Sequence, residues 1–549
     1  MSSASVISAA RRALGTRVAR LHVLAGLCVG ALLPMTACKS TGGDDLVPPR
    51  VDLASTISIS RAHDAVTPPY WFSQEDEQFL DEVQRGAFNF LWKSSDPARG
   101  IATGMVADRT SKPTVSVAGV GFQLSGICVG VERGWITRDQ GQRRAELILR
   151  SLRDNETNRK YGLFYHFLNP QNAGQPEDAY EHVVSTIDSA ILFAGVLTVS
   201  QYFGGEVATI GNQLFGDANW QAFICSPTAK DRKIRGFVSL GWKPNEKSQP
   251  QGEGALLPYA WIDNGDEHRL VAFLATCAPK DEHRVRPNLY YQLRRQLGSY
   301  SREDADGVMR DTGQMVWFPW SGALFASFFA NCWIDYPSIG TDNPALLEVP
   351  RRARVDWWEN SRRHVLLHQL KALEAKGQFA NFGRDAWGLS ASDVAGGYAV
   401  PGVFPTLSEM PGSIPEVDYT KFEVKDNFGD GTLAPYAAGC AILFDPQRSV
   451  AALRNYREFE TPPGQPAIWT NPARGGYGFQ DAFNATTGWV APDSVAIDQG
   501  PLLLCIENAR TGLLWQIFHS HPYVKAGMER LQLRRELQHS KPRAAVETK

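Results

Sequence analysis

Acidic side chains recur in loops that are rich in glycine and aromatic residues, and these loops carry the side chains best suited to chemistry. Segments such as GMVADR, GLFYHF and GFQDAFN place carboxylates, an imidazole or rings beside small residues. Carboxylates accept hydrogen bonds from hydroxyl groups, and aromatic rings cover the apolar faces of sugars. The pattern therefore predicts a glycan-binding cleft; the structural alternative for any one loop is that Asp and Gly cap a helix or a turn. The pattern selects Asp108, Arg109, Tyr165, His166, Asp188, Glu267, Asp385, Trp387, Asp393, Tyr398, Asp430, Asp481, Asn484 and Asp498.

Other kinds of active site are excluded by missing motifs. The sequence has no Gly-Lys-Ser/Thr phosphate loop, no His-Glu-x-x-His zinc motif and no Gly-x-Ser-x-Gly nucleophile elbow. Residues 266–269 and 281–284 repeat the tetrapeptide Asp-Glu-His-Arg, but adjacent Glu and His on a helix point about 100° apart and pair poorly on a metal. The segment DNFGDG at 426–431 lacks the distal Glu of a calcium loop. The net charge is −2, so no basic surplus points to nucleic acid, and we expect no metal or cofactor.

The elements that must position these loops are predicted to be helices. Apolar residues recur at spacings of three and four, and Thr137 with Gln140 matches a capping box. The segments 191–199 and 501–506 have no polar side, so helices that contain them must be enclosed by others. Short strand-like segments such as 237–244 do not alternate with helices, which argues against a Rossmann sheet or a TIM barrel. We predict an all-α fold with two concentric rings of helices and a few short strands in loops. The predicted helices are 114–132, 137–153, 185–203, 266–278, 318–334, 355–376, 432–444, 446–457 and 498–518.

The N-terminus has the layout of a secretory signal. Residues 1–20 contain four arginines and no acid, residues 21–37 are apolar and end in small residues, and Cys38 follows. Met-Thr-Ala-Cys resembles a bacterial lipobox, which implies cleavage before Cys38 and lipidation of this residue; an ordinary signal peptide with a chance cysteine is the alternative. We predict a lipoprotein signal peptide at 1–37, a lipid-anchored tether at 38–72, a helical domain at 73–530 and a charged tail at 531–549. The expected location is the outer membrane of a bacterial envelope, facing the periplasm, and the expected state is a monomer anchored by lipid alone.

Several long motifs resemble the glucoamylase-like (glycoamylase) family, which is related to the endo-β-1,2-glucanases of glycoside hydrolase family 144. They are YGLFYHFL, VSTIDSAILFAGVLT, VERGWI, AWGLSASD, GDGTLAP, QDAFN and IDQGPLLLCIENARTGLLW, in order from about Phe79 to Val524. The resemblance implies an (α/α)6 barrel over residues 73–530, hydrolysis of a β-glucan, most directly β-1,2-glucan, with inversion, and no cofactor. It implies that Glu267 is catalytic, and we predict Asp188 as the second catalytic residue. From the loop pattern we predict that substrate is bound by Asp108, Arg109, Tyr165, His166, Trp387, Asp393, Tyr398, Asp430 and Asp481.

The sequence departs from the family pattern where a carboxylate is expected. The family places Glu two positions before Ser-Thr-Ile-Asp, and here that position is Val183. Positions that usually hold His and Gln ahead of Trp333 are occupied by Ser327, Phe328 and Asn331, and Pro337 replaces a familiar Arg. Hydrolysis of a glycosidic bond generally needs two carboxyl groups, so the identity of the second acid stays open. The candidates beside Glu267 are Asp188, Glu181 and Asp108.

Two further functions remain possible on the sequence alone. Loss of the carboxylate at Val183 is compatible with a glycan-binding lipoprotein that does not catalyse hydrolysis. Helical barrels also host polysaccharide lyases, for which Tyr165 and His166 would be candidate bases. Because a shared fold does not separate these classes, the site has to be built from its geometry.

Overall fold

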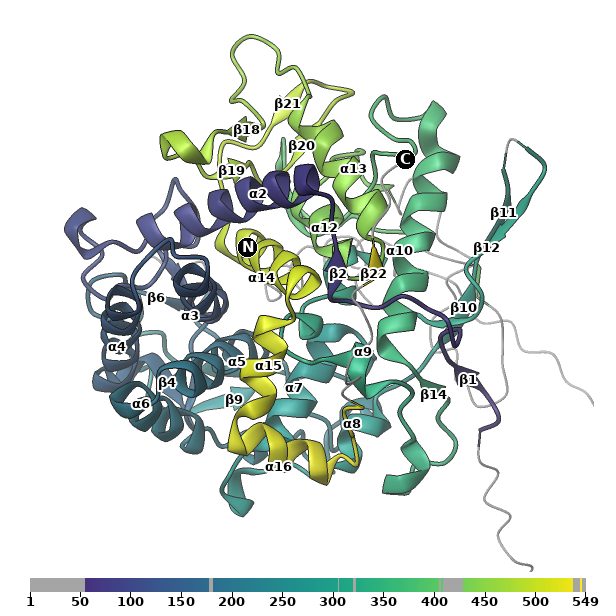
Figure 1. Ribbon diagram of the computed structural model, residues 1–549. Coiled ribbons are helices and arrows are strands. Elements are labelled where there is room, and N and C mark those ends of the chain that lie inside the picture. Colours follow the sequence, from purple (N-terminus) through teal and green to yellow (C-terminus); the bar gives the residue numbers. More distant parts are fainter. Residues whose placement is uncertain are drawn as a thin grey trace, which may run out of the picture.

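The computed structural model describes residues 55–176, 181–304, 306–318, 322–403, 406–407, 428–536 and 544–545. The predicted signal peptide at 1–37 and the predicted lipidation site Cys38 lie outside the described residues. Within the described residues, helices dominate and the strands are two to four residues long. Figure 1 shows the helices arranged around a common centre.

Six inner segments follow one another around a ring in chain order. Neighbouring segments of the ring pack together, and Phe328 against Tyr436 joins the 3₁₀ segment to α12 with their ring centroids 6.0 Å apart. The inner segments are α3 (Val117–Glu132), α5 (Thr186–Phe203), α7 (Asp266–Cys277), the 3₁₀ turns η7 (Leu324–Ser327) and η8 (Ala330–Cys332), α12 (Pro435–Cys440) and α14 (Ala496–Arg510).

Outer helices cover the ring of inner segments. Helix α2 packs on the inner helices α14 and α3. Helices α4 and α6 pack on each other, and together they cover α3 and α5. Helix α10 packs on η7, and α13 packs on α12. This alternation of inner and outer helices is the (α/α)6 barrel that the sequence predicted. The outer helices are α2 (Gln74–Lys93), α4 (Arg138–Asp154), α6 (Gly205–Gly216), α10 (Trp357–Glu374) and α13 (Pro446–Arg457), and α15 (Leu513–Ser520) and α16 (Pro522–Arg530) extend from α14 to contact α5 and α7.

The apolar helices form the inner ring because they have no side that favours water. Every residue of α5 from Thr186 to Ser200 is buried. Helices α3 and α5 approach closely at two glycines, since a Cβ on Gly195 would collide with the backbone of Gly121. Helix α5 is long and apolar enough to cross a membrane by length and composition, but 83% of that window is buried inside the barrel. Enclosure by other helices therefore accounts for its apolar composition.

Two predicted helices are wrong in their detail. The segment 318–334 forms the separate turns η7 and η8, because Asp266 Oδ2 accepts the backbone N–H groups of Ala330 (3.0 Å) and Asn331 (3.2 Å). Those N–H groups are then not available to continue an α-helix. The segment 498–518 divides into α14 and α15 at Gly512, whose φ of 69° lies in the left-handed region that glycine favours.

The packed body extends beyond both predicted ends. Ile59, Tyr70 and Phe72 are buried, although they belong to the predicted tether, and Arg61 pairs with Asp356 at 2.7 Å. At the other end Leu531 and Leu533 are buried, and Glu536 N donates to Ser338 O at 2.8 Å. Burial of these apolar side chains outweighs the Pro-rich and charged composition from which the boundaries at 72 and 530 were predicted.

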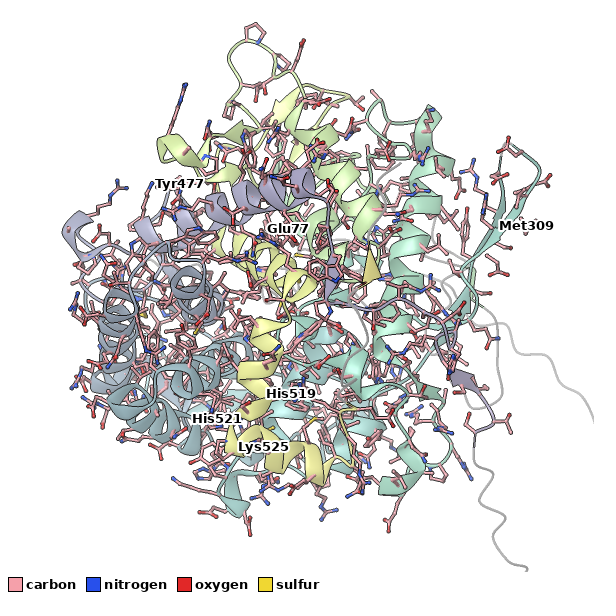
Figure 2. All side chains as sticks on the ribbon, in the orientation of Figure 1. Glu77, Met309, Tyr477, His519, His521 and Lys525 are labelled. Atoms are coloured by element: carbon pink, nitrogen blue, oxygen red, sulfur yellow. The ribbon has the colours of Figure 1, made fainter. Side chains whose placement is uncertain are left out.

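Short strands form within the loops that lead into the inner helices. A separate hairpin of β11 (Ser301–Glu303) and β12 (Met309–Asp311) projects from the body, and Figure 2 shows Met309 on it, away from the barrel. The loop pairs are β3 (Val115–Ser116) with β6 (Phe167–Leu168), β7 (Val184–Ser185) with β8 (Gly241–Pro244) and β9 (Gly254–Leu256), β15 (Ser392–Val394) with β16 (Gly397–Ala399), and β20 (Phe483–Asn484) with β21 (Trp489–Val490).

The cysteines of the described residues are free thiols. Cys128, Cys225, Cys277, Cys332, Cys440 and Cys505 are all buried, and none forms a disulfide. Cys332 Sγ and Cys505 Sγ lie 3.6 Å apart, which is hydrogen-bond rather than bonding distance.

Candidate active site

The loops that enter the inner helices form one layer at one end of the barrel. Ala496 N, at the start of α14, donates to Asp108 O at 2.8 Å, and Val117 N, at the start of α3, donates to His166 O at 3.0 Å. Thr186 N, at the start of α5, donates to Leu240 O at 3.2 Å. These backbone bonds bring acids that are far apart in the sequence to the positive ends of neighbouring helices.

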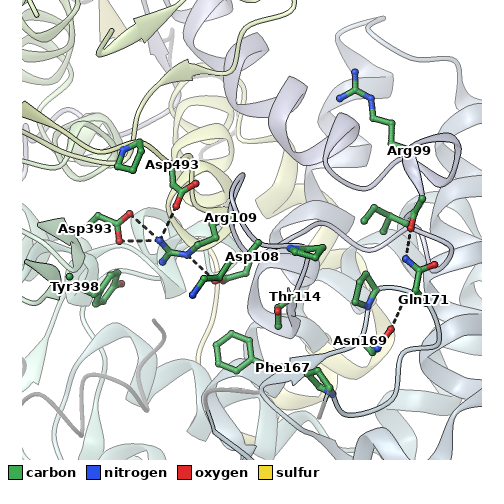
Figure 3. A pocket seen from close by; sticks show the side chains of 18 of the residues that line it. Arg99, Asp108, Arg109, Thr114, Phe167, Asn169, Gln171, Asp393, Tyr398 and Asp493 are labelled. Atoms are coloured by element: carbon green, nitrogen blue, oxygen red, sulfur yellow. Dashed lines mark hydrogen bonds and ion pairs between the residues drawn. The ribbon is translucent and has the colours of Figure 1, made fainter. Parts of the chain in front are cut away.

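A cavity of about 940 Å³ opens in this layer. Four of the residues that the sequence predicted as substrate ligands line it, namely Asp108, Arg109, Asp393 and Tyr398. Figure 3 shows Asp108, Arg109, Asp393 and Asp493 gathered on one side, with Arg99 and Gln171 on the other. Its volume is in the range of natural ligand pockets, and it is large enough for several sugar rings. The remaining polar and aromatic lining includes Lys112, Phe167, Asn169 and Trp489.

Arg109 is the centre of one side of the cavity, which we call the Arg109 cluster (Asp108, Arg109, Asp393 and Asp493). Arg109 Nη1 lies 3.2 and 3.1 Å from the two carboxylate oxygens of Asp393 and 3.3 Å from Asp493 Oδ2. Burial opposes the charge of the guanidinium, but Asp393 and Asp108 raise the pKa of Arg109 above its ordinary value. The cation is therefore permanent, and it compensates carboxylates that would otherwise repel each other.

Asp493 completes the cluster and uses both of its oxygens. Oδ1 accepts from Thr110 Oγ1 (2.7 Å) and Ser111 N (2.8 Å), and Oδ2 accepts from Ser111 Oγ (2.7 Å). Burial would raise the pKa of Asp493, but the hydrogen bonds from Ser111 and Thr110 and the charge of Arg109 lower it. This residue was missed by the sequence analysis, and its only signal is the Pro-Asp-Ser turn before α14.

Asp108 is the carboxylate of the cluster with the least committed oxygens. Its nearest charged contact is Arg109 Nε, 3.6 Å from Oδ2, and within the described residues its carboxylate accepts no hydrogen bond from a side-chain or backbone donor. Asp393, in contrast, is held by Arg109 through both oxygens. A carboxylate that faces a cavity with a free oxygen is suited to bind or activate a water molecule.

A second group of ionisable residues lies at the start of α5, and we call it the His166 cluster (Glu181, His166 and Asp188). His166 Nδ1 lies 2.5 Å from Glu181 Oε1, and His166 Nε2 lies 3.7 Å from Asp188 Oδ1. Burial opposes protonation of the ring, but Asp188 and Glu181 raise the pKa of His166 above 6.5. Burial also raises the pKa of Asp188, an effect that His166 opposes. His166 and Asp188 are both about 1% exposed and do not line the cavity.

Glu267 lies in the first turn of α7 and is 2% exposed. Its neighbour Asp266 is fixed by Arg269 and by Asn331, whose Nδ2 donates to Asp266 Oδ2 at 2.9 Å. Asp266 therefore anchors the start of α7 and is not an acid that faces substrate. Asn331 and Ser327, at the positions where the sequence departs from the family, are fully buried and serve this internal packing, and Ser327 Oγ lies 2.5 Å from His364 Nδ1.

Besides His166, four of the predicted substrate ligands lie away from the cavity wall in the described residues. Tyr165 is buried and its hydroxyl donates to Pro250 O at 2.7 Å, and Trp387 is buried at 1% exposure. Asp430 is exposed in a turn, where its Oδ1 accepts from Thr432 N at 3.0 Å. Asp481 is buried beneath Asp393 and accepts its backbone N–H at 2.7 Å. These placements give the residues structural contacts and leave Asp108, Arg109, Asp393 and Tyr398 at the cavity.

In the part of the chain that the structure describes, no group of three or more His, Cys, Asp or Glu side chains is arranged to hold a metal ion. Fold and site thus define an (α/α)6-barrel protein with a carboxylate-lined cavity at the N-terminal end of its inner helices.

Comparisons with known proteins agree with this class. The glycoamylase family model, described as putative glucoamylase, matches residues 258–522. A curated protein of Parabacteroides distasonis, an exo β-1,2-glucooligosaccharide sophorohydrolase (non-reducing end), is 27% identical over 494 residues, which are 84% of this chain and 58% of that relative. A solved structure of a putative glucoamylase from Bacteroides uniformis is 26% identical with a TM-score of 0.62 and covers 84% of this chain and 99% of its own.

An endo-β-1,2-glucanase from Chitinophaga pinensis, solved with sophorotriose and glucose, shares the fold with a TM-score of 0.63 at 23% identity, over 84% of this chain and 98% of that one. The match of residues 258–522 to the glycoamylase family model agrees with the resemblance that the motifs showed. It spans 58% of the length of the curated relative that it matches.

Proposed function

We propose that this protein is a glycoside hydrolase that cleaves β-1,2-glucan by general acid and base catalysis. The observation that carries the proposal is the cavity at the N-terminal ends of the inner helices, where Asp108 presents a carboxylate beside Arg109. The curated relative from Parabacteroides distasonis, whose name gives β-1,2-glucooligosaccharides as its substrate, supports the choice of linkage.

Glu267 is the proposed general acid. It is nearly fully buried in the first turn of α7, at the start of an inner helix, as Asp188 is in α5 and Asp498 in α14. A general acid has to hold its proton until it passes it to the oxygen of the leaving sugar, and burial of a carboxyl group favours its neutral form.

Asp108 is the proposed second carboxylate, in preference to Asp188. Asp188 is enclosed under His166 and is 1% exposed, whereas Asp108 lines the cavity and keeps an oxygen free. A base on the far side of the sugar from the acid would activate a water molecule and invert the anomeric centre, which needs about 6.5–9.5 Å between the two carboxyl groups. The second carboxylate, which the family pattern places at position 183, would thus be supplied by Asp108 from another loop.

The test is product analysis on a panel of β-glucans that includes linear and cyclic β-1,2-glucan. Purified protein is incubated with each polymer, new reducing ends are counted, and the anomer of the first product is read by NMR. Release from β-1,2-glucan as the α-anomer supports an inverting hydrolase. Release from another linkage alone would overturn the substrate, and a product with an unsaturated sugar would show a lyase.

A non-catalytic glycan-binding protein is the second candidate, and Val183 favours it. Val183 is buried at 8% exposure and cannot replace a carboxylate in acid–base chemistry. Binding of β-1,2-glucan without release of any product, measured by calorimetry beside the product assay, would select this candidate.

We further propose that the chain is a lipoprotein of the bacterial envelope, with residues 1–37 removed and Cys38 lipidated, that works as a monomer at the periplasmic side of the outer membrane. The support is the sequence alone: a basic start, an apolar segment and Met-Thr-Ala-Cys. Membrane fractionation of the wild type and Cys38→Ser tests it, because the variant should leave the membrane fraction. An unchanged distribution of Cys38→Ser would contradict the lipid anchor.

A further inference from the structure

Two buried carboxyl groups lie directly beneath the cavity wall. Asp481 and Asp498 are each 1% exposed, and Asp498 lies in the first turn of α14. The two carboxyl groups interact with each other, and Tyr436 also contacts Asp498. Asp481 Oδ1 and Asp498 Oδ2 are buried, and among the described residues no N–H or O–H group donates to either oxygen.

Two interacting carboxylates that each keep an oxygen without a donor are strongly unfavourable in a buried site. Such a pair does not ionise fully, and one proton held between the two groups provides the missing donor. The charge of Arg109 opposes the raised pKa of Asp481, but Asp393 and Asp493 already pair with its Nη1. The charged or titratable groups that face the pair are Arg109 and Asp108 before α3, Asp393 on β15, Tyr398 on β16, and Tyr436 and Cys440 on α12.

Asp481 also holds the strand that carries a cavity residue. Its Oδ2 accepts the backbone N–H of Asp393 at 2.7 Å, and Asp393 pairs with Tyr398 across β15 and β16. Both of these residues line the cavity. The charge on Asp481 therefore acts on the cavity wall through one backbone hydrogen bond and through repulsion of the Asp393 carboxylate.

We propose that Asp481 and Asp498 share a single proton, and that this carboxyl pair positions Asp393 and Tyr398 for substrate binding. Loss of the proton places a second negative charge under Asp393 and loosens the β15–β16 hairpin. The pair does not touch substrate, so Asp481 and Asp498 are positioning residues. The positioning role rests on the proposed hydrolysis, because it is tested by KM. The shared proton does not rest on it, because it is tested by thermal unfolding.

The pH dependence has a definite sign. Burial and the charge of Asp393 raise the pKa of Asp481 to about 6, and burial and Asp481 raise the pKa of Asp498 well above its usual range. The folded protein therefore holds a proton that the unfolded chain, with an Asp pKa near 3.9, has released. The stability from this proton is complete below about pH 4 and is lost as the pH rises through about 6 and above.

The experiment compares wild type, Asp498→Asn and the control variant Asp76→Asn. Asp76 is a buried acid on the outer helix α2, and it pairs with Arg454 on α13. The amide of Asp498→Asn replaces the shared proton by a permanent donor to Asp481. Between pH 6 and pH 8 we expect KM for β-1,2-glucan to rise about tenfold in wild type, the factor that corresponds to one pKa unit, with a smaller change in kcat. Asp498→Asn should flatten the KM profile, and Asp76→Asn should keep it.

The stability arm separates this inference from the proposed function. Thermal unfolding from pH 4 to pH 8 should show a fall in Tm of roughly 2–4 °C in wild type that is absent in Asp498→Asn and present in Asp76→Asn. Asp481→Asn serves if Asp498→Asn does not fold. Equal Tm profiles in wild type and Asp498→Asn would overturn the shared proton. Different Tm profiles with equal KM profiles would overturn the positioning role, and absence of hydrolysis in every protein would count against the proposed function alone.

Discussion

The barrel end presents two ionisable clusters that use the same residue types in opposite ways. In the Arg109 cluster a permanent cation compensates several carboxylates that reach an open cavity. In the His166 cluster a titratable imidazole lies between Glu181 and Asp188 and is sealed from solvent. The difference teaches that carboxylates from similar loops divide between the cavity wall and the interior of the barrel end, a division that depends on tertiary packing.

The contrast also explains how the protein tolerates Val183. The main chain of Val183 still joins the loops, because His166 N donates to Val183 O at 2.9 Å. Only the side chain differs from the family pattern, and its Cγ1 lies beside Gly241 of β8. In the proposed mechanism the carboxylate that a Glu would supply there comes from Asp108, which lines the cavity.

The largest effect is expected from Glu267→Gln, because both accounts of the base need the same acid. Removal of the proton donor should lower the rate of β-1,2-glucan hydrolysis by about 10²–10⁴-fold, measured as reducing ends released. The matched control is Glu282→Gln, since Glu282 is exposed in the second copy of the same Asp-Glu-His-Arg tetrapeptide. Full activity of Glu267→Gln would remove Glu267 from the mechanism.

Arg109→Met removes the positive charge that compensates the carboxylates of the Arg109 cluster. Asp108, Asp393 and Asp493 would then face one another without a cation, so kcat/KM should fall by about 10–100-fold with a lower Tm. Arg109→Lys keeps the charge but loses the planar fork, and it should recover part of the activity. The control is Arg143→Met, because Arg143 is exposed on α4 and pairs only with Asp139. If Arg109→Met matches wild type, the Arg109 cluster is not the functional side.

His166→Gln tests whether the sealed cluster contributes stability rather than catalysis. His166 has a raised pKa in the folded state, so the stability from its protonated form is present below pH 6.5 and is lost as the pH rises through its folded pKa. The Tm difference between wild type and His166→Gln should therefore be largest in acid and shrink in base, by roughly 2–4 °C. His283→Gln is the control, and a pH-independent Tm difference would contradict the imidazolium.

The smallest effect is expected from Val183→Glu, which restores the family residue type. Because Asp108 already supplies the second carboxylate, the hydrolysis rate should change by less than about threefold. A missing base would be worth about 10²–10⁴-fold. A gain of a hundredfold in Val183→Glu would therefore show that the second carboxylate is absent from the native site, and the matched variant Val183→Gln would show whether the charge is responsible.

The ring of helices could be predicted from the sequence, because apolar periodicity over long segments depends on local spacing. The break of 318–334 into η7 and η8 could not, since it depends on Asp266, which is more than sixty residues away in sequence. The sequence also could not predict which acidic residues line the cavity and which are buried beneath it. Asp481 and Asp493 both lie in Gly- and Pro-containing loops, and only tertiary packing puts Asp493 beside Arg109 and buries Asp481 under Asp393.

The most direct test of the account compares Asp108→Asn with Asp188→Asn at saturating β-1,2-glucan. Both variants remove one negative charge and nearly no volume, so they differ mainly in the cluster that they alter. The account predicts that Asp108→Asn lowers kcat by at least about a hundredfold while Asp188→Asn changes Tm and its pH dependence and keeps most of kcat. The opposite order, with kcat lost in Asp188→Asn and kept in Asp108→Asn, would contradict the assignment of catalysis to the Arg109 cluster.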